Sequence, residues 1–124
     1  MDDNEKLKIV NKAKELFDCT LTNTSNRKKF PAKYRVLVER MQNKSIDIYD
    51  CIMDANRKRL YIPKEKIERN SLQTQAISDC DKLNMFIETA MNHNLISAGL
   101  CDEWSKKVKD VKYMTIAWRT NDNS

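Results

Sequence analysis

Glycine and proline are almost absent from this chain of 124 residues: Gly99 is the only glycine, and Pro31 and Pro63 are the only prolines. Average usage near 7% and 5% would give roughly nine and six. An all-β sandwich needs a turn signal about every 8 to 12 residues, and phosphate-binding loops need clustered glycines. The deficit therefore disfavours β domains, Rossmann units and P-loops, and favours an all-α chain.

Long apolar runs and paired cysteine motifs are also missing. No stretch of 18 or more apolar residues occurs, and residues 1–5 are acidic where a signal peptide is basic and then apolar. The four cysteines, widely spaced and without a CxxC pair, are Cys19, Cys51, Cys80 and Cys101. These features predict a cytoplasmic protein that contacts no membrane and keeps its thiols reduced.

Apolar residues recur at steps of three and four residues in four segments, the spacing of amphipathic helices. The first helix is expected to follow a capping box of Asp2 and Glu5 and to break within residues 20–27, which are rich in Thr, Asn and Ser. The second and third are expected to open at Pro31 and Pro63, because proline suits the first helical position.

The second helix is expected to end near Lys58 and the third near Leu95, and Ser97 is the expected N-cap of the fourth. The residues on the expected core stripes are Leu7, Ile9, Val10, Ala13, Leu16, Phe17, Leu21, Tyr34, Leu37, Val38, Met41, Ser45, Ile48, Tyr49, Ile52, Ala55, Leu72, Ala76, Cys80, Leu83, Ile87, Ala90, Met91, Asn94, Cys101, Trp104, Val108, Val111, Thr115 and Trp118.

Connections mostly shorter than ten residues place successive helices antiparallel to each other. The sequence therefore predicts a single all-α domain over residues 1–124, an antiparallel up-down-up-down four-helix bundle. The last six residues, from Arg119, are polar and are expected to fray.

Positive charge is concentrated in the middle third of the chain. Residues 27–69 carry thirteen basic and six acidic side chains, whereas residues 1–26 and 70–124 each carry one more acidic than basic side chain. A concentration of this kind suggests a polyanion as partner, although soluble helices also carry lysines for solubility alone.

Some apolar residues point away from the core stripes at 100° per residue. Single exposed apolar residues are normal, but six of them on three helices of a 14.6 kDa chain predict contact between subunits. The expected interface residues are Val36, Ile46, Met53, Met85, Tyr113 and Ile116.

Catalytic chemistry finds little support in the sequence. The only histidine, His93, lies near the end of the third helix and is expected to help end it. No cluster has metal-ligand spacing, and Cys80 and Cys101 fall on core stripes where thiols act as small hydrophobic groups. The sequence predicts no catalytic residue, no metal and no cofactor.

The sequence resembles the Avd-like four-helix-bundle family over roughly residues 28–118. The matching elements, in order, are Lys29-Phe30-Pro31-Ala32-Lys33-Tyr34-Arg35, Arg40-Met41-Gln42-Asn43, Asp54-Ala55-Asn56-Arg57, Asp81-Lys82-Leu83, Leu95-Ile96-Ser97 and Trp118. Avd is the accessory variability determinant of diversity-generating retroelements, and the wider superfamily includes proteins encoded within intervening sequences of ribosomal RNA genes. The family often has a Gly-containing segment before its late Trp, whereas Met114-Thr115-Ile116-Ala117 stands here.

The resemblance implies a non-enzymatic bundle that assembles as a homopentamer. It also implies binding to nucleic acid (structured RNA, RNA/DNA hybrid or DNA) and to the retroelement reverse transcriptase. Together with the charge distribution it assigns phosphate contacts to Lys28, Lys29, Lys33, Arg35, Arg40, Lys44, Arg57, Lys58, Arg59, Lys64, Lys66 and Arg69. Lys33, Arg40 and Lys44 step by seven and four residues and are expected to share a face, and Arg35 has a structural ion pair as its alternative role.

Two other functions stay open at this stage. The first is a protein-interaction module that docks on a reverse transcriptase or another partner without touching nucleic acid. The second, with less support, is a small enzyme such as a nuclease.

Overall fold

The computed structural model describes residues 2–124, which form four α-helices and, within that range, no β-strand. The helices are α1 (Asp3–Thr24), α2 (Arg35–Arg57), α3 (Pro63–Asn92) and α4 (Ala98–Asp122), and a short 3₁₀ turn, η1 (Ala32–Tyr34), precedes α2. The all-α prediction is confirmed.

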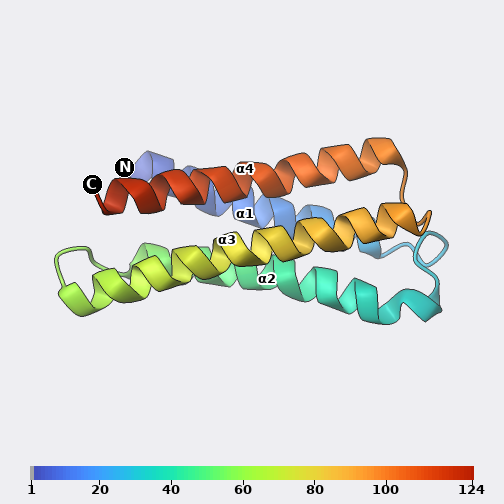
Figure 1. Ribbon diagram of the computed structural model, residues 1–124, viewed down its shortest axis with the longest axis horizontal. Coiled ribbons are helices and arrows are strands. Elements are labelled where there is room, and N and C mark those ends of the chain that lie inside the picture. The colour runs from blue at the N-terminus through green and yellow to red at the C-terminus, as the bar shows by residue number, and fades with distance from the viewer. Residues whose placement is uncertain (1) are drawn as a thin grey trace.

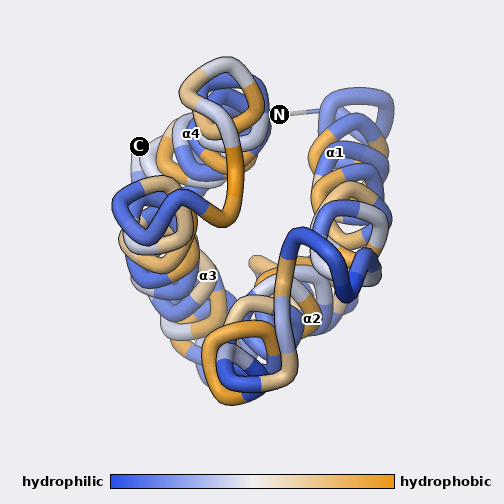
Figure 2. The backbone as a smooth tube through the Cα atoms, turned by 90° about the vertical axis from the view of Figure 1, so that its right-hand side faces the viewer, coloured by the Kyte–Doolittle hydropathy of each residue, from blue (hydrophilic) through white to orange (hydrophobic). Residues whose placement is uncertain are grey.

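Each helix packs against the next one in the chain, and α4 also packs against α1. Both chain ends lie at the end of the molecule that carries the α2–α3 connection, and the α1–α2 and α3–α4 connections lie at the opposite end (Figure 1). Seen along the helices, the four surround a common centre in chain order (Figure 2).

Three of the expected helix starts are confirmed, two of them by capping hydrogen bonds. Asp2 caps α1 by accepting a hydrogen bond from the Glu5 backbone N–H at 2.8 Å, and Ser97 caps α4 by accepting one from the Leu100 N–H at 3.1 Å. Pro63 is the first residue of α3. These caps satisfy N–H groups that no carbonyl within the helix can reach.

Other helix ends differ from the sequence prediction. Pro31 is the N-cap of η1 and not the first residue of α2, because the Tyr34 N–H bonds to the Pro31 carbonyl three residues back and the α-helical pattern begins only at Arg35. The third helix ends at Asn92, earlier than predicted, since Asn94 adopts a left-handed backbone with φ of 60° that terminates the helix.

The core follows the predicted stripes most closely in α4, where all six expected residues are buried: Cys101, Trp104, Val108, Val111, Thr115 and Trp118. The Trp104 indole N–H donates to the Thr20 hydroxyl at 3.2 Å, which joins α4 to α1 through the core. In α1, by contrast, Leu7 and Leu21 are exposed and do not belong to the core.

A buried ion pair closes the end of the molecule that holds both termini. The Arg69 guanidinium, 2% exposed, donates to both carboxylate oxygens of Asp122 at 2.7 and 2.8 Å and to the Lys58 carbonyl at 3.2 Å. Gln73 donates to the same carboxylate at 2.8 Å. Helix α4 therefore runs without a break to Asp122, and the prediction of a frayed tail from Arg119 is wrong because Asp122 is held by this cluster.

Replacing Asp122 with alanine should destabilise the protein by about 3–5 kcal/mol, because the Arg69 charge would stay buried without its partner. Urea unfolding followed by circular dichroism measures this difference. Asp110→Ala removes an exposed carboxylate from the same helix and is expected to change stability by less than about 0.5 kcal/mol. Equal effects of the two variants would contradict the role given to the pair.

Candidate nucleic-acid interface

The basic residues selected from the sequence lie at two opposite ends of the bundle and along the helix between them. Lys28, Lys29, Lys33 and Arg35 belong to the α1–α2 connection and the start of α2, whereas residues 57–66 surround the α2–α3 connection. Helix α2, with 23 residues, separates the two groups by about 34 Å. The single cluster predicted from the sequence is therefore two clusters.

At the α2–α3 end, carboxylates neutralise most of the cations. Lys58 pairs with Glu68 at 2.6 Å, Arg59 pairs with Glu65 at 2.8 Å, and Arg57 lies 3.8 Å from Asp54. The hydrogen bond from Lys58 to Glu68 raises the pKa of the lysine, and the hydrogen bond from Arg59 lowers the pKa of Glu65. Both shifts favour the charged, paired state.

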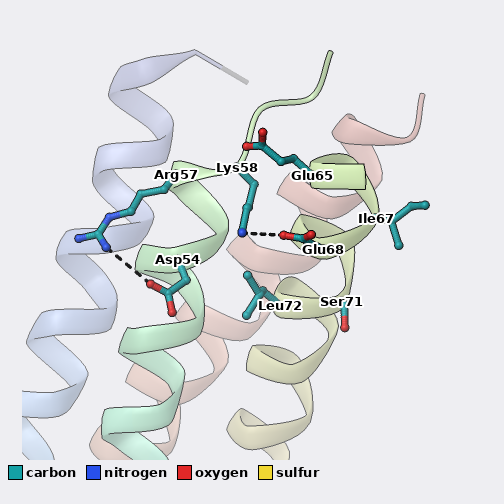
Figure 3. A pocket seen from close by; sticks show the side chains of 8 residues that line it. All are labelled: Asp54, Arg57, Lys58, Glu65, Ile67, Glu68, Ser71 and Leu72. Carbon is teal, nitrogen blue, oxygen red and sulfur yellow. Dashed lines mark hydrogen bonds and ion pairs between the residues drawn. The ribbon is translucent and has the colours of Figure 1, made fainter. Parts of the chain in front are cut away.

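These pairs surround an open cavity of about 740 Å³ between α2 and α3 (Figure 3). In the close-up, the Lys58 and Glu68 side chains point toward each other, and Arg57 reaches back to Asp54. Three acidic and two basic side chains line the cavity, so it offers an anion no excess of positive charge. Only Lys64 and Lys66 of the selected cations at this end have no carboxylate partner among the described residues.

Three further residues of the predicted set contact other helices of the bundle. Arg69 is removed from the set, because its guanidinium is buried in the pair with Asp122 and cannot reach a phosphate. Lys44 lies 3.7 Å from the buried Asp79 on α3, and the exposed Arg40 lies over the Phe86 ring of α3 at 5.7 Å. Arg40 and Lys44 therefore both face α3, as their shared position on α2 predicts.

The α1–α2 end has a different balance of charge. Residues 25–38 contain five basic side chains and no acidic one. Lys28, Lys29 and Lys33 are exposed and have no carboxylate partner among residues 2–124, and Arg35 meets only Glu39, at 3.9 Å between two exposed side chains. A surface pair of this kind contributes little and leaves Arg35 available to a stronger anion.

Arg27 belongs to this group and was missed in the sequence analysis. It is exposed, has no carboxylate partner in the described residues, and lines a cavity together with Arg35. The only signal in the sequence was its position directly before Lys28 and Lys29, at the border of the basic segment.

The backbone of the α1–α2 connection is fixed by its own hydrogen bonds and by one buried side chain. The Asn26 carbonyl accepts from the Lys29 and Phe30 N–H groups at 3.1 and 2.9 Å, and the Asn26 side chain accepts from the Lys28 N–H at 2.9 Å. Phe30 is 4% exposed and belongs to the core. Anchoring Phe30 inward leaves the three preceding basic side chains outside, and Figure 2 shows this connection as strongly hydrophilic.

The expected interface residues lie on different flanks of the bundle. On α2, Ile46 and Met53 are about 20° apart around the helix axis, on the same side as Gln42. Gln42 donates a hydrogen bond to Thr24 of α1 at 2.9 Å. Val36 lies near Arg40, which faces α3. Val36, Met85 and Tyr113 are exposed, and the other three, Ile46, Met53 and Ile116, are partly buried.

The four thiols are free, and burial suppresses the ionisation of three of them. Cys80 and Cys101 are buried as predicted. Desolvation raises the pKa of the Cys80 thiol to about 12 and that of Cys51 to about 11, and it also raises the pKa of Cys19. His93 caps the end of α3, and its ring packs edge-on against Tyr34 at 5.8 Å.

Native protein at pH 8 should therefore react with iodoacetamide far more slowly than unfolded protein, because the thiolate is the reactive species. A pKa about two units above that of a free thiol lowers the thiolate fraction roughly 100-fold. Mass spectrometry over time measures the rate at each cysteine. If Cys19, Cys51 or Cys80 reacts as fast as in the unfolded chain, the prediction is wrong for that cysteine.

Comparisons of the chain with models of known protein families, with curated proteins and with solved structures find no match. None of the helices in the described residues is both long enough and apolar enough to cross a membrane.

Proposed function

We propose that the protein is a non-catalytic accessory protein of a diversity-generating retroelement that binds nucleic acid at its α1–α2 end and associates with the reverse transcriptase. In this proposal the chain is an up-down-up-down bundle of the Avd-like kind, located in the cytoplasm. The observation that carries the nucleic-acid role is the group of five cations in residues 25–38, on a backbone held by its own hydrogen bonds. Four of them have no carboxylate partner among the described residues, and Arg35 has only the exposed pair with Glu39. The motifs that resemble the Avd-like family support the retroelement role.

Unopposed lysines and arginines are the groups that gain most from contact with phosphates. Each phosphate contact releases condensed counterions, which supplies affinity without reading sequence. A cation already paired with a carboxylate must first give up that partner. The α1–α2 end therefore provides stronger support for the proposal than the α2–α3 end, although both are basic in sequence.

Neutralising Lys28 and Lys29 together (Lys28→Gln, Lys29→Gln) should weaken binding to duplex DNA about tenfold and flatten the dependence of log affinity on log salt. Each lost phosphate contact reduces the slope by about 0.9. Fluorescence anisotropy at several salt concentrations measures both quantities.

The matched control is Lys106→Gln with Lys109→Gln, which removes the same charge from exposed positions of α4. It is expected to leave the slope nearly unchanged. If both double variants weaken binding equally, only net charge matters and the assigned interface is wrong. Absence of binding by the wild-type protein at low salt would exclude the nucleic-acid role itself.

We also propose that the chain forms a homopentamer. A ring assembled head to tail uses two different surfaces of each subunit. The separation of Val36 from Ile46 and Met53 on the two flanks of α2 is compatible with that requirement.

Light scattering should therefore give about five times the 14.6 kDa of one chain. Ile46→Glu with Met53→Glu should shift the protein toward monomer, because a charge buried in an interface without a partner is costly. Lys106→Glu is the surface control and should leave the mass unchanged. A wild-type mass near that of one chain at tens of micromolar would contradict the proposal.

A protein-docking role without nucleic acid is the second candidate, and the α2–α3 end favours it. Leu60, Tyr61 and Ile67 are exposed there, at 38, 78 and 72%, beside cations that are already paired. Exposed aromatic and aliphatic side chains of this kind are typical of protein contacts. In the proposed function this end is the contact with the reverse transcriptase.

A further inference from the structure

The α1–α2 connection contains a cavity of about 340 Å³ next to the unopposed cations. Two arginines, Arg27 and Arg35, line it together with apolar surface from Phe30, Pro31, Ala32 and Val38. No acidic side chain lines this cavity. Its volume is at the lower end of the range of small-molecule sites, about 300–1,000 Å³.

The two hydroxyl groups in the wall are already engaged with the end of α1. The Thr24 hydroxyl donates to the Thr20 carbonyl at 2.7 Å, and the Ser25 hydroxyl donates to the Leu21 carbonyl at 2.7 Å. These bonds cover carbonyl oxygens that would otherwise present the negative end of the helix to a ligand. Arg27 and Arg35 are the basic residues that line the cavity, and Arg35 has only the exposed pair with Glu39 at 3.9 Å.

We propose that this cavity binds one unpaired nucleotide of a single-stranded nucleic acid. Arg27 and Arg35 hold its phosphate, since guanidinium groups bind phosphate oxygens with paired hydrogen bonds. The sugar and the base pack against the apolar wall. A bare anion would leave that wall without a contact. The inference rests on the proposed function and names the form of nucleic acid that the α1–α2 end prefers.

A base in a duplex cannot enter such a cavity, because it is stacked and paired. An unpaired base can turn out of the strand and pack on protein surface, and this is how most single-stranded sequences are held. Lys28, Lys29 and Lys33, exposed on the same connection, would then contact the phosphates on either side. The cavity thus adds a preference for single strands to a charge pattern that alone would bind any nucleic acid.

Filling the cavity tests this inference without changing any charge. Ala32 is exposed and lines the cavity, so Ala32→Trp should occupy the space of the base. Its matched control is Ser71→Trp, which places the same side chain in the cavity at the α2–α3 end. Affinity is measured by anisotropy for fluorescein-labelled oligouridine and for the same strand annealed to oligoadenosine, after circular dichroism has verified each fold.

Ala32→Trp is expected to weaken binding to the single strand about tenfold, the size of one base contact, and to change duplex affinity by less than about twofold. Ser71→Trp should change neither. If Ala32→Trp leaves single-strand binding unchanged, or weakens both forms equally, the cavity holds no nucleotide and the inference fails while the proposed function stands. If the wild-type protein binds neither form at low salt, the proposed function fails as well.

A second variant removes the phosphate donors, in case the tryptophan disturbs the turn. Arg27→Gln with Arg35→Gln should lower single-strand affinity more than Arg57→Gln with Arg59→Gln, which removes the same charge at the paired end. Equal losses would overturn the assignment.

Competition with uridine monophosphate and with inorganic phosphate identifies what the cavity recognises. Displacement of oligouridine by the nucleotide at lower concentration than by phosphate supports recognition of a nucleotide, and equal displacement overturns it. Displacement at concentrations near the affinity of the strand itself would show that the free nucleotide is the ligand.

Discussion

The buried guanidinium of Arg69 is the constraint on which one end of this bundle depends. It belongs to α3, bonds to the carbonyl that follows α2 and to a carboxylate near the end of α4, and lies 4.8 Å from the Trp118 ring. A charge that is 2% exposed is tolerated only when its hydrogen bonds are satisfied, so the three helices must keep one arrangement around it. The pair holds the last turn of α4, which runs without a break to Asp122.

Pairing, more than the number of basic residues, distinguishes the two ends of the molecule. The α2–α3 end is as rich in lysine and arginine as the other, but Glu65, Glu68 and Asp54 lie against its cations. The α1–α2 connection has no acidic residue, and Glu39 on α2 meets Arg35 at 3.9 Å. Of the five cations in residues 57–66, three therefore have a carboxylate partner among the described residues, whereas in residues 25–38 only Arg35 has one.

The helices, their caps and most of the core could be predicted from the sequence, because those features depend on residues three to four positions apart. Asp2, Ser97 and the stripe from Cys101 to Trp118 are examples. The pair of Arg69 with Asp122 joins residues 53 positions apart, and no local pattern marks it. For the same reason, the sequence pattern led to the prediction that Arg69 contacts phosphate and that the C-terminal turn frays. The site was predicted only in part: Lys28, Lys29, Lys33 and Arg35 do lie together, but their separation from residues 57–66 and the role of Arg27 required the three-dimensional arrangement.

Order of the backbone gives the α1–α2 end its advantage as a binding surface. Binding costs entropy whenever a flexible loop must be fixed, and Asn26 and the buried Phe30 have already fixed this one. Only the ends of the basic side chains remain to be ordered when a phosphate arrives. The opposite end differs, since Lys58 and Arg59 are held by carboxylates there and the aromatic Tyr61 and aliphatic Ile67 are exposed. In the proposed function, these two ends, separated by the length of α2, have different partners: the polyanion binds at the α1–α2 end and the protein surface at the α2–α3 end.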